Sequence, residues 1–131
     1  MLLYHDPRAP NPRRVRIFLA EKNVAYDTID VLIAQSAHLT DDFRRKNPLS
    51  LLPVLELPDG RILRESMAIC RYIEELYPDP PLMGTDAKSR ALIATHVRHI
   101  EWDGFLAGAE AFRNAAPSFS DRGIPGVTGV P

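Results

Sequence analysis

Cysteine is almost absent from this sequence, since Cys70 is the only one among 131 residues. A single cysteine excludes an internal disulfide and a Cys-x-x-Cys redox pair. The chain also lacks any apolar run near the roughly 18 residues of a membrane-spanning helix, and its start, MLLYHDP, turns polar too early for a signal peptide. These absences predict a cytoplasmic protein with no membrane partner. Cys70 falls beside the apolar residues Ile69 and Ile73 and is interpreted as a small buried side chain.

An excess of one charge is also lacking, because 16 basic residues balance 17 acidic ones to a net charge of -1. Two short basic clusters, at 13–16 and 44–46, have no interleaved aromatic residues that could stack on bases. They are therefore interpreted as solvated helix faces, and no nucleic-acid partner is expected. The hydrophobic share of 45% and the charged share of 25% are typical of a globular protein.

The first half of the chain alternates strand and helix patterns. Strands are predicted at 1–5 and 26–31, the first ending at Asp6-Pro7. Apolar spacing predicts a helix at 11–23 with Val15, Phe18, Leu19 and Lys22 on one face, and a short polar helix at 38–46.

The middle of the chain carries a clear hairpin signal. Strands are predicted at 54–57 and 61–64 around the turn Pro58-Asp59-Gly60. A second amphipathic helix, at 65–77, follows the hairpin. A strand-helix-strand unit forms a parallel pair by a right-handed crossover, and the hairpin adds antiparallel strands. The order therefore predicts an α/β fold, with a four-stranded mixed sheet and helices on both faces.

A proline-rich linker at 79–85 is expected to separate a first domain, 1–78, from a second region, 86–131. The second region opens with a long helix at 86–113, capped by Thr85 or Asp86. Its glycine- and proline-rich tail is expected to be irregular or disordered.

Three segments in this order resemble the glutathione transferase family: APNPRRVRIFLAEK, NPLSLLPVLELPDG and RESMAICRYIEELYP. The resemblance covers residues 1 to about 83, and it implies a thioredoxin-like βαβ-α-ββα domain. The helix at 86–113 then resembles the first helix of the family's all-α second domain.

The resemblance implies a site for glutathione, the co-substrate. Leu52-Pro53 matches the family's cis-proline, whose preceding residue pairs through its backbone with the cysteinyl part of glutathione. Glu65 and Ser66 match the pair that holds the γ-glutamyl end. Asn11 is expected to be the N-cap of the first helix, with Pro12 as its first residue, and a helix N-terminus stabilises a thiolate.

The family activates the thiol with Tyr, Ser or Cys, and here Ala9 falls where several classes have serine or cysteine. Asn11 is the nearest polar candidate, and it matches the asparagine of the TPN motif in the bacterial nu class. Asn11 either donates a hydrogen bond to the thiolate or serves only as the N-cap. Tyr4, at the end of the first strand, is a second candidate, whose alternative is packing.

Two further groups depart from the pattern or lie outside it. Ser50 and Leu51 stand where many relatives have Gly followed by Lys or Gln, so the glycyl carboxylate would need Arg13, Lys46 or Asn47 instead. His96, His99 and Asp103 recur at i, i+3 and i+7 on the long helix. Such a stripe could bind a metal, but we expect none, and favour a place for His99 and Asp103 in the electrophile cleft.

The resemblance implies a glutathione transferase that binds glutathione as a thiolate, for conjugation to a small electrophile or reduction of a disulfide. The alternatives are a non-catalytic interaction module of the same fold and a truncated fragment. Relatives continue through four or more further helices, whereas this sequence ends soon after the first. Apolar residues of the long helix would then be exposed, which predicts a homodimer or another partner.

Overall fold

The computed structural model describes residues 1–115 of the chain. The chain divides into two compact units, one formed by Met1–Leu82 and the other beginning at Met83. The predicted linker, 79–85, spans this division. The irregular tail expected from the sequence falls largely on residues 116–131, which lie outside the described part.

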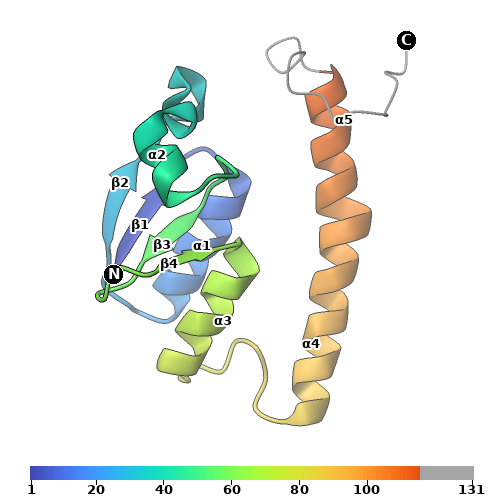
Figure 1. The fold of residues 1–131 in the computed structure, drawn as a ribbon. Helices are drawn as coiled ribbons and strands as arrows, with labels where there is room; N and C mark the ends of the chain where they lie inside the picture. The colour runs from blue at the N-terminus through green and yellow to red at the C-terminus, as the bar shows by residue number, and fades with distance from the viewer. Residues whose placement is uncertain (116–131) are drawn as a thin grey trace. The chain divides into compact units, whose positions relative to one another are not determined.

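A four-stranded mixed sheet forms the centre of the first unit (Figure 1), as the sequence predicts. Its strands are β1 (Leu2–His5), β2 (Asp27–Asp30), β3 (Val54–Glu56) and β4 (Ile62–Arg64), in the order β2-β1-β3-β4. β1 runs parallel to β2, whereas β3 is antiparallel to both β1 and β4. The β1–β2 crossover and the β3–β4 hairpin are thus both confirmed.

Helix α1 (Pro10–Glu21) connects β1 to β2, and α3 (Ser66–Leu76) follows β4. Between β2 and β3 lie two 3-10 turns, η1 (Ile33–Gln35) and η2 (Ala37–Leu39), and then α2 (Asp41–Lys46). The sequence predicts α2 from residue 38, but the α-helix begins only after Thr40. The Thr40 hydroxyl accepts a hydrogen bond from the Phe43 N–H at 3.4 Å, which makes Thr40 the N-cap.

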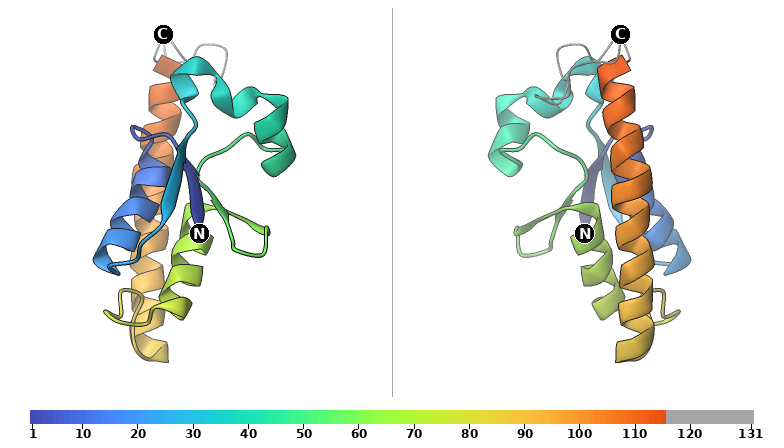
Figure 2. Two further views of the ribbon diagram at one scale, coloured as in Figure 1. Left: turned by 90° about the vertical axis from the view of Figure 1, so that its left-hand side faces the viewer. Right: turned by 90° about the vertical axis from the view of Figure 1, so that its right-hand side faces the viewer.

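The sheet buries apolar side chains on both faces because consecutive strand residues point in opposite directions. On one face Tyr4 and Val54 pack with Phe43 of α2 and with Val31. Leu3 and Leu55, their neighbours in sequence, are fully buried on the other, where α1 and α3 supply the remaining core side chains: Val15, Leu19, Ile69 and Ile73. Figure 2 shows α1 and α2 on opposite sides of the sheet.

Lys22 is the C-cap of α1, and its charged side chain is fully buried. Its ammonium lies 2.5 Å from the Glu74 carboxylate and donates to the backbone carbonyls of Tyr77 and Pro80 at 2.7 and 2.5 Å. The lysine thus ties the end of α1 to the end of α3 and to the segment that follows. A buried charge is stable only when it is paired and hydrogen-bonded in this way.

The second unit is helical through residue 115. Helix α4 (Ala87–His99) begins at the N-cap Asp86, one of the two predicted caps, which forms a reciprocal capping box with Ser89. The sequence predicts one uninterrupted α-helix, but a π-helical segment, η3 (Ile100–Leu106), lies between α4 and α5 (Ala107–Ala115). Among the described residues, no helix is both long enough and apolar enough to span a membrane.

Replacing Lys22 with methionine tests the buried pair. Lys22→Met keeps most of the apolar stem but leaves Glu74 without this ammonium. We expect the free energy of unfolding to fall by about 3 kcal/mol in urea denaturation. The control is Arg45→Met, which removes the exposed ion pair with Asp42 and should cost less than about 1 kcal/mol. Equal stability of the two variants would contradict a stabilising role for the buried lysine.

Candidate functional site

Three segments of the first unit meet at one end of the sheet. Val54, the first residue of β3, is paired with Tyr4 on one side and with Arg64, the last residue of β4, on the other. The residues that follow β1, precede β3 and follow β4 therefore lie at the same end. The loop into α1, the segment that leads into β3 and the start of α3 can be followed there in Figure 1.

The start of α1 differs from the prediction that Asn11 is the N-cap and Pro12 the first helical residue. The N-cap is Ala9, and the helix begins at Pro10. Proline fits this first position because its ring fixes φ near the helical value and it has no N–H to leave unpaired. The Arg13 N–H donates to the Ala9 carbonyl at 3.1 Å, so Asn11 lies inside the first turn.

This placement leaves the Asn11 N–H as the only open backbone donor of the first turn within residues 1–115. The residues at positions 10 and 12 are prolines without N–H groups, and the Ala9 N–H donates to the Asp6 carbonyl at 3.1 Å. Neither the backbone N–H nor the carboxamide of Asn11 has a partner in this part of the chain. No acidic side chain lies in the turn to neutralise the helix dipole. The end of α1 can therefore stabilise a bound anion.

The approach to α1 is held by Asp6, which the sequence analysis did not single out. The Asp6 side chain accepts hydrogen bonds from the backbone N–H groups of Arg8 and Ile33, both at 2.8 Å. Burial by itself raises the pKa of Asp6, but these two hydrogen bonds, together with the charges of Arg8 and His5, outweigh it and hold the pKa below its usual value. The signal was present in the sequence, because Asp-Pro commonly begins a turn in which the carboxylate accepts from the chain ahead.

The second segment contains the expected cis peptide bond between Leu52 and Pro53. The Leu52 side chain packs against the core cluster of Tyr4, Val31, Phe43 and Val54. Within residues 1–115, no group accepts from the Leu52 N–H or donates to its carbonyl. The backbone at Leu52 therefore offers one donor and one acceptor beside the first residue of β3.

The third segment is the start of α3. Glu65 is exposed and occupies the N-cap position with φ of 67° and ψ of 117°, a conformation that non-glycine residues rarely adopt. Ser66 is buried, and its hydroxyl accepts a hydrogen bond from the Arg14 guanidinium at 3.1 Å. Sparsely populated backbone conformations of this kind are concentrated at binding sites.

Arg14 is a residue of this end that the sequence analysis placed only in a solvated cluster. Its contact with Ser66 joins the first helix to the third and places positive charge near the start of α3. Cys70, one turn further along α3, is buried as predicted. Burial raises the pKa of the Cys70 thiol to about 12, and the charge of Arg14 offsets only part of this shift. Cys70 is therefore protonated at neutral pH.

Tyr4 lies on the α2 side of the sheet, where its ring makes an edge contact with Phe43 at a centroid distance of 6.5 Å. Its hydroxyl donates to the Glu56 carboxylate at 2.7 Å, and the Lys46 ammonium donates to the same oxygen at 2.9 Å. The hydrogen bond from Lys46 and that from Tyr4 lower the pKa of Glu56. This environment favours the packing interpretation of Tyr4.

The three candidates for binding the glycyl carboxylate of a ligand differ in whether their side chains are already engaged in the structure. Lys46 is engaged by Glu56, and its ammonium lies 4.9 Å from the centre of the Tyr4 ring. Asn47 is almost completely buried and uses its side chain within its own loop. Arg13 is exposed on α1.

His99 and Asp103 lie in the second unit and are both exposed. His99 is the last residue of α4, and Asp103 lies within the π-helical segment, where the i to i+5 hydrogen-bond pattern changes the angular spacing of side chains. Within residues 1–115, no group of three or more His, Cys, Asp or Glu residues is arranged to hold a metal ion.

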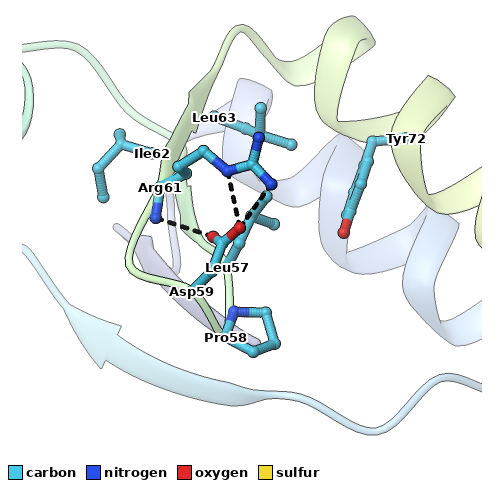
Figure 3. Close-up of a pocket in the computed structure, with 7 residues that line it drawn as sticks. All are labelled: Leu57, Pro58, Asp59, Arg61, Ile62, Leu63 and Tyr72. Carbon is cyan, nitrogen blue, oxygen red and sulfur yellow. Dashed lines mark hydrogen bonds and ion pairs between the residues drawn. The ribbon is translucent and has the colours of Figure 1, made fainter.

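An open pocket of about 530 Å³ lies elsewhere in the first unit, beside the β3–β4 turn and Tyr72 of α3 (Figure 3). Asp59 and Arg61 of this turn are joined by an ion pair. The turn follows the last residue of β3, whereas Pro53 precedes its first residue. The pocket therefore lies at the opposite end of β3 from the three segments.

Comparison with known proteins identifies the family. The sequence model described as "Glutathione S-transferase, N-terminal domain" matches residues 9–76, more than half of the chain. Glutathione S-transferase 2 of Saccharomyces cerevisiae is 33% identical over 119 residues, which are 89% of this chain and 51% of that protein. Maleylpyruvate isomerase of a Ralstonia species is 38% identical over 69% of this chain and 42% of its own length. The chain thus spans about half the length of these curated relatives.

Solved structures agree with the sequence comparison. A glutathione S-transferase domain-containing protein from Marinobacter aquaeolei superposes with a TM-score of 0.87 at 35% identity, over 95% of this chain and 64% of that one. A glutathione transferase homologue from Sulfitobacter, solved with bound glutathione, gives a TM-score of 0.79 at 26% identity, over 92% and 60% of the two chains. The finer resemblance to the nu class stays a prediction. These matches show that this chain belongs to the glutathione S-transferase family, through its N-terminal domain.

Proposed function

We propose that this chain binds glutathione at the shared end of its sheet and holds the sulfur as a thiolate at the start of α1. The bound thiolate would be conjugated to a small electrophile or would reduce a disulfide. The observation that carries the proposal is that the N–H of Asn11 and both the N–H and the carbonyl of Leu52 have no partner within the described residues and lie at this end. A peptide with a terminal carboxylate and an ionisable thiol matches these groups.

The middle of glutathione would lie along Leu52. An extended peptide can add to the edge of a sheet by pairing with one donor and one acceptor on an open backbone residue. Leu52 offers both, directly ahead of β3, and the cis bond to Pro53 belongs to this arrangement. We assign the cysteinyl residue of glutathione to this position.

The γ-glutamyl end would lie at the start of α3. Glu65 is exposed and supplies a carboxylate for the ammonium group, while Ser66 and the first N–H groups of α3 suit the carboxylate. Arg14 adds positive charge beside Ser66. At the other end of the ligand, Arg13 is the candidate for the glycyl carboxylate, because Lys46 and Asn47 are engaged elsewhere.

Asn11 is the proposed activating residue. A thiolate at the start of α1 would accept from its peptide N–H or carboxamide and would be stabilised by the helix dipole. Ala9, at the N-cap, has no group that could take this role, and the Tyr4 hydroxyl donates to Glu56. Tyr4 is therefore the weaker candidate.

Two other activities fit specific observations. Isomerisation is favoured by the similarity to maleylpyruvate isomerase and to the maleylacetoacetate isomerase of Dictyostelium discoideum, which is 36% identical over 70% of this chain. A thiolate can add to a conjugated cis double bond, allow rotation about the resulting single bond and leave again as thiolate.

Binding without turnover is favoured by Ala9 at the N-cap. A homodimer belongs to the same proposal, supported by the exposed apolar side chains of Ile100 and Trp102. A cytoplasmic location stays a prediction.

Calorimetric titration with glutathione tests the site. The wild-type chain should bind with one site per chain, and Ser66→Ala should weaken binding about tenfold, because a carboxylate loses one charge-assisted hydrogen bond. Ser89→Ala, which alters the cap of α4 in the other unit, serves as the control and should bind normally. A wild-type chain that releases no heat at millimolar glutathione would overturn the proposed function.

The pH dependence of conjugation tests Asn11. Loss of its carboxamide should raise the pKa of the bound glutathione thiol, so Asn11→Ala should conjugate a chlorodinitrobenzene about tenfold more slowly near pH 6.5. The deficit should shrink at alkaline pH, where the thiol is ionised in both proteins. Gln35→Ala, an exposed amide in η1, should match wild type. A protein that binds glutathione tightly but turns over neither the chlorodinitrobenzene at any pH nor the substrates of the maleyl isomerases would favour the non-catalytic module.

Cys70 should take no part in the chemistry. With a pKa of about 12 and a buried side chain, the thiol should react with a thiol-exchange reagent at pH 8 only after denaturation. Cys70→Ala should therefore retain wild-type glutathione affinity. Rapid labelling of the folded protein, or loss of binding in this variant, would contradict the assignment.

A further inference from the structure

Asn47 is a buried polar residue that the proposed function does not use. Only 1% of its surface is exposed, and it ends α2 five residues before the cis bond. Its carboxamide Nδ2 donates to the Leu51 carbonyl at 2.8 Å, and its Oδ1 accepts from the Leu49 N–H at 3.2 Å. Its backbone carbonyl accepts from the Ser50 N–H at 2.8 Å. Asn47, through its side chain and its backbone carbonyl, thus organises the turn that leads to Leu52.

The turn has little else to hold its shape. Leu49 and Leu51 are 65% and 49% exposed, so their side chains contribute little packing. Ser50 has a φ of 55°, in the left-handed region that a non-glycine residue adopts only when its surroundings require it. A buried carboxamide, in contrast, is destabilising unless it is hydrogen-bonded. The need to satisfy Asn47 therefore determines the path of residues 48–51.

The peptide group between Leu51 and Leu52 connects this turn to the proposed ligand. The Leu51 carbonyl and the Leu52 N–H belong to one rigid plane, and in a trans peptide they point in opposite directions. This bond is trans, since the cis bonds are those before Pro53 and Pro80. Because Asn47 holds the carbonyl toward the protein interior, the Leu52 N–H must point away from it.

We propose that Asn47 is a positioning residue for glutathione, which orients the Leu52 N–H through the Leu51 carbonyl without touching the ligand. The inference rests on the proposed function, because it concerns the same backbone group that pairs with the cysteinyl part of the tripeptide. It adds a determinant of affinity beyond the residues assigned to direct contact. The expected consequence is a change in binding rather than in chemistry.

Two variants remove the hydrogen bond to Leu51. Asn47→Asp keeps an oxygen that can accept from the Leu49 N–H, but as a carboxylate it has no donor for the Leu51 carbonyl. Asn47→Ala removes both side-chain hydrogen bonds. We expect the dissociation constant for glutathione, measured by calorimetry, to rise about tenfold in each. In steady-state conjugation the KM for glutathione should rise by a similar factor with kcat unchanged, because the lost contact is made equally in the ground state and the transition state.

The control for lost stability is Ile73→Val, a small cavity in the buried part of α3. It should lower the melting temperature without changing glutathione affinity, measured where all variants are folded. Unchanged glutathione affinity in both Asn47 variants would overturn the positioning role and leave the proposed function intact. An equal loss of affinity in Ile73→Val would have the same consequence. A lower kcat with unchanged KM would also contradict it. Absence of binding by the wild-type chain would instead overturn the proposed function, and the inference with it.

Discussion

The proposed site depends on which backbone groups this protein satisfies internally and which it leaves open at one end of its sheet. A buried or half-buried N–H or carbonyl without a partner is destabilising, so proteins pair nearly all of them. Asn11 and Leu52 are exceptions within the described residues, and they lie at the same end. Two prolines remove the competing donors from the first turn of α1, and the start of α3 adds a third set of N–H groups. This end is therefore suited to a ligand that supplies the missing partners.

Buried polar side chains hold the loops at this end in place. Asp6 fixes the approach to α1 by accepting two backbone hydrogen bonds, and Asn47 fixes the approach to the cis bond in a similar way. Lys22 performs the equivalent task at the opposite end of α1, where it holds the carbonyls that follow α3. Hydrogen bonds are directional, so each of these residues determines a backbone orientation that apolar packing alone would leave less defined.

The chemistry that such a site can perform depends on how the thiol is ionised. The helix dipole and a carboxamide both stabilise a thiolate, but neither can accept its proton, so the proton must pass to solvent. A site of this kind needs no nucleophile of its own, and Cys70 cannot provide one because its pKa is about 12. The absence of a hydroxyl or thiol at Ala9 is therefore compatible with either turnover or binding alone.

The order of the strands and helices was determined by the sequence itself, because alternating and helical apolar patterns, prolines and the Pro-Asp-Gly turn act over a few residues. The mixed sheet, the hairpin and the cap at Asp86 could be found in this way. The cis bond before Pro53 and the role of Ser66 were predicted only from the resemblance to the family. The start of α1 was predicted two residues late, since two closely spaced prolines both suit a first turn. Only the tertiary structure decided the partners of Asp6, Arg14, Lys22 and Asn47, because these contacts join backbone and side chains that no local pattern brings together.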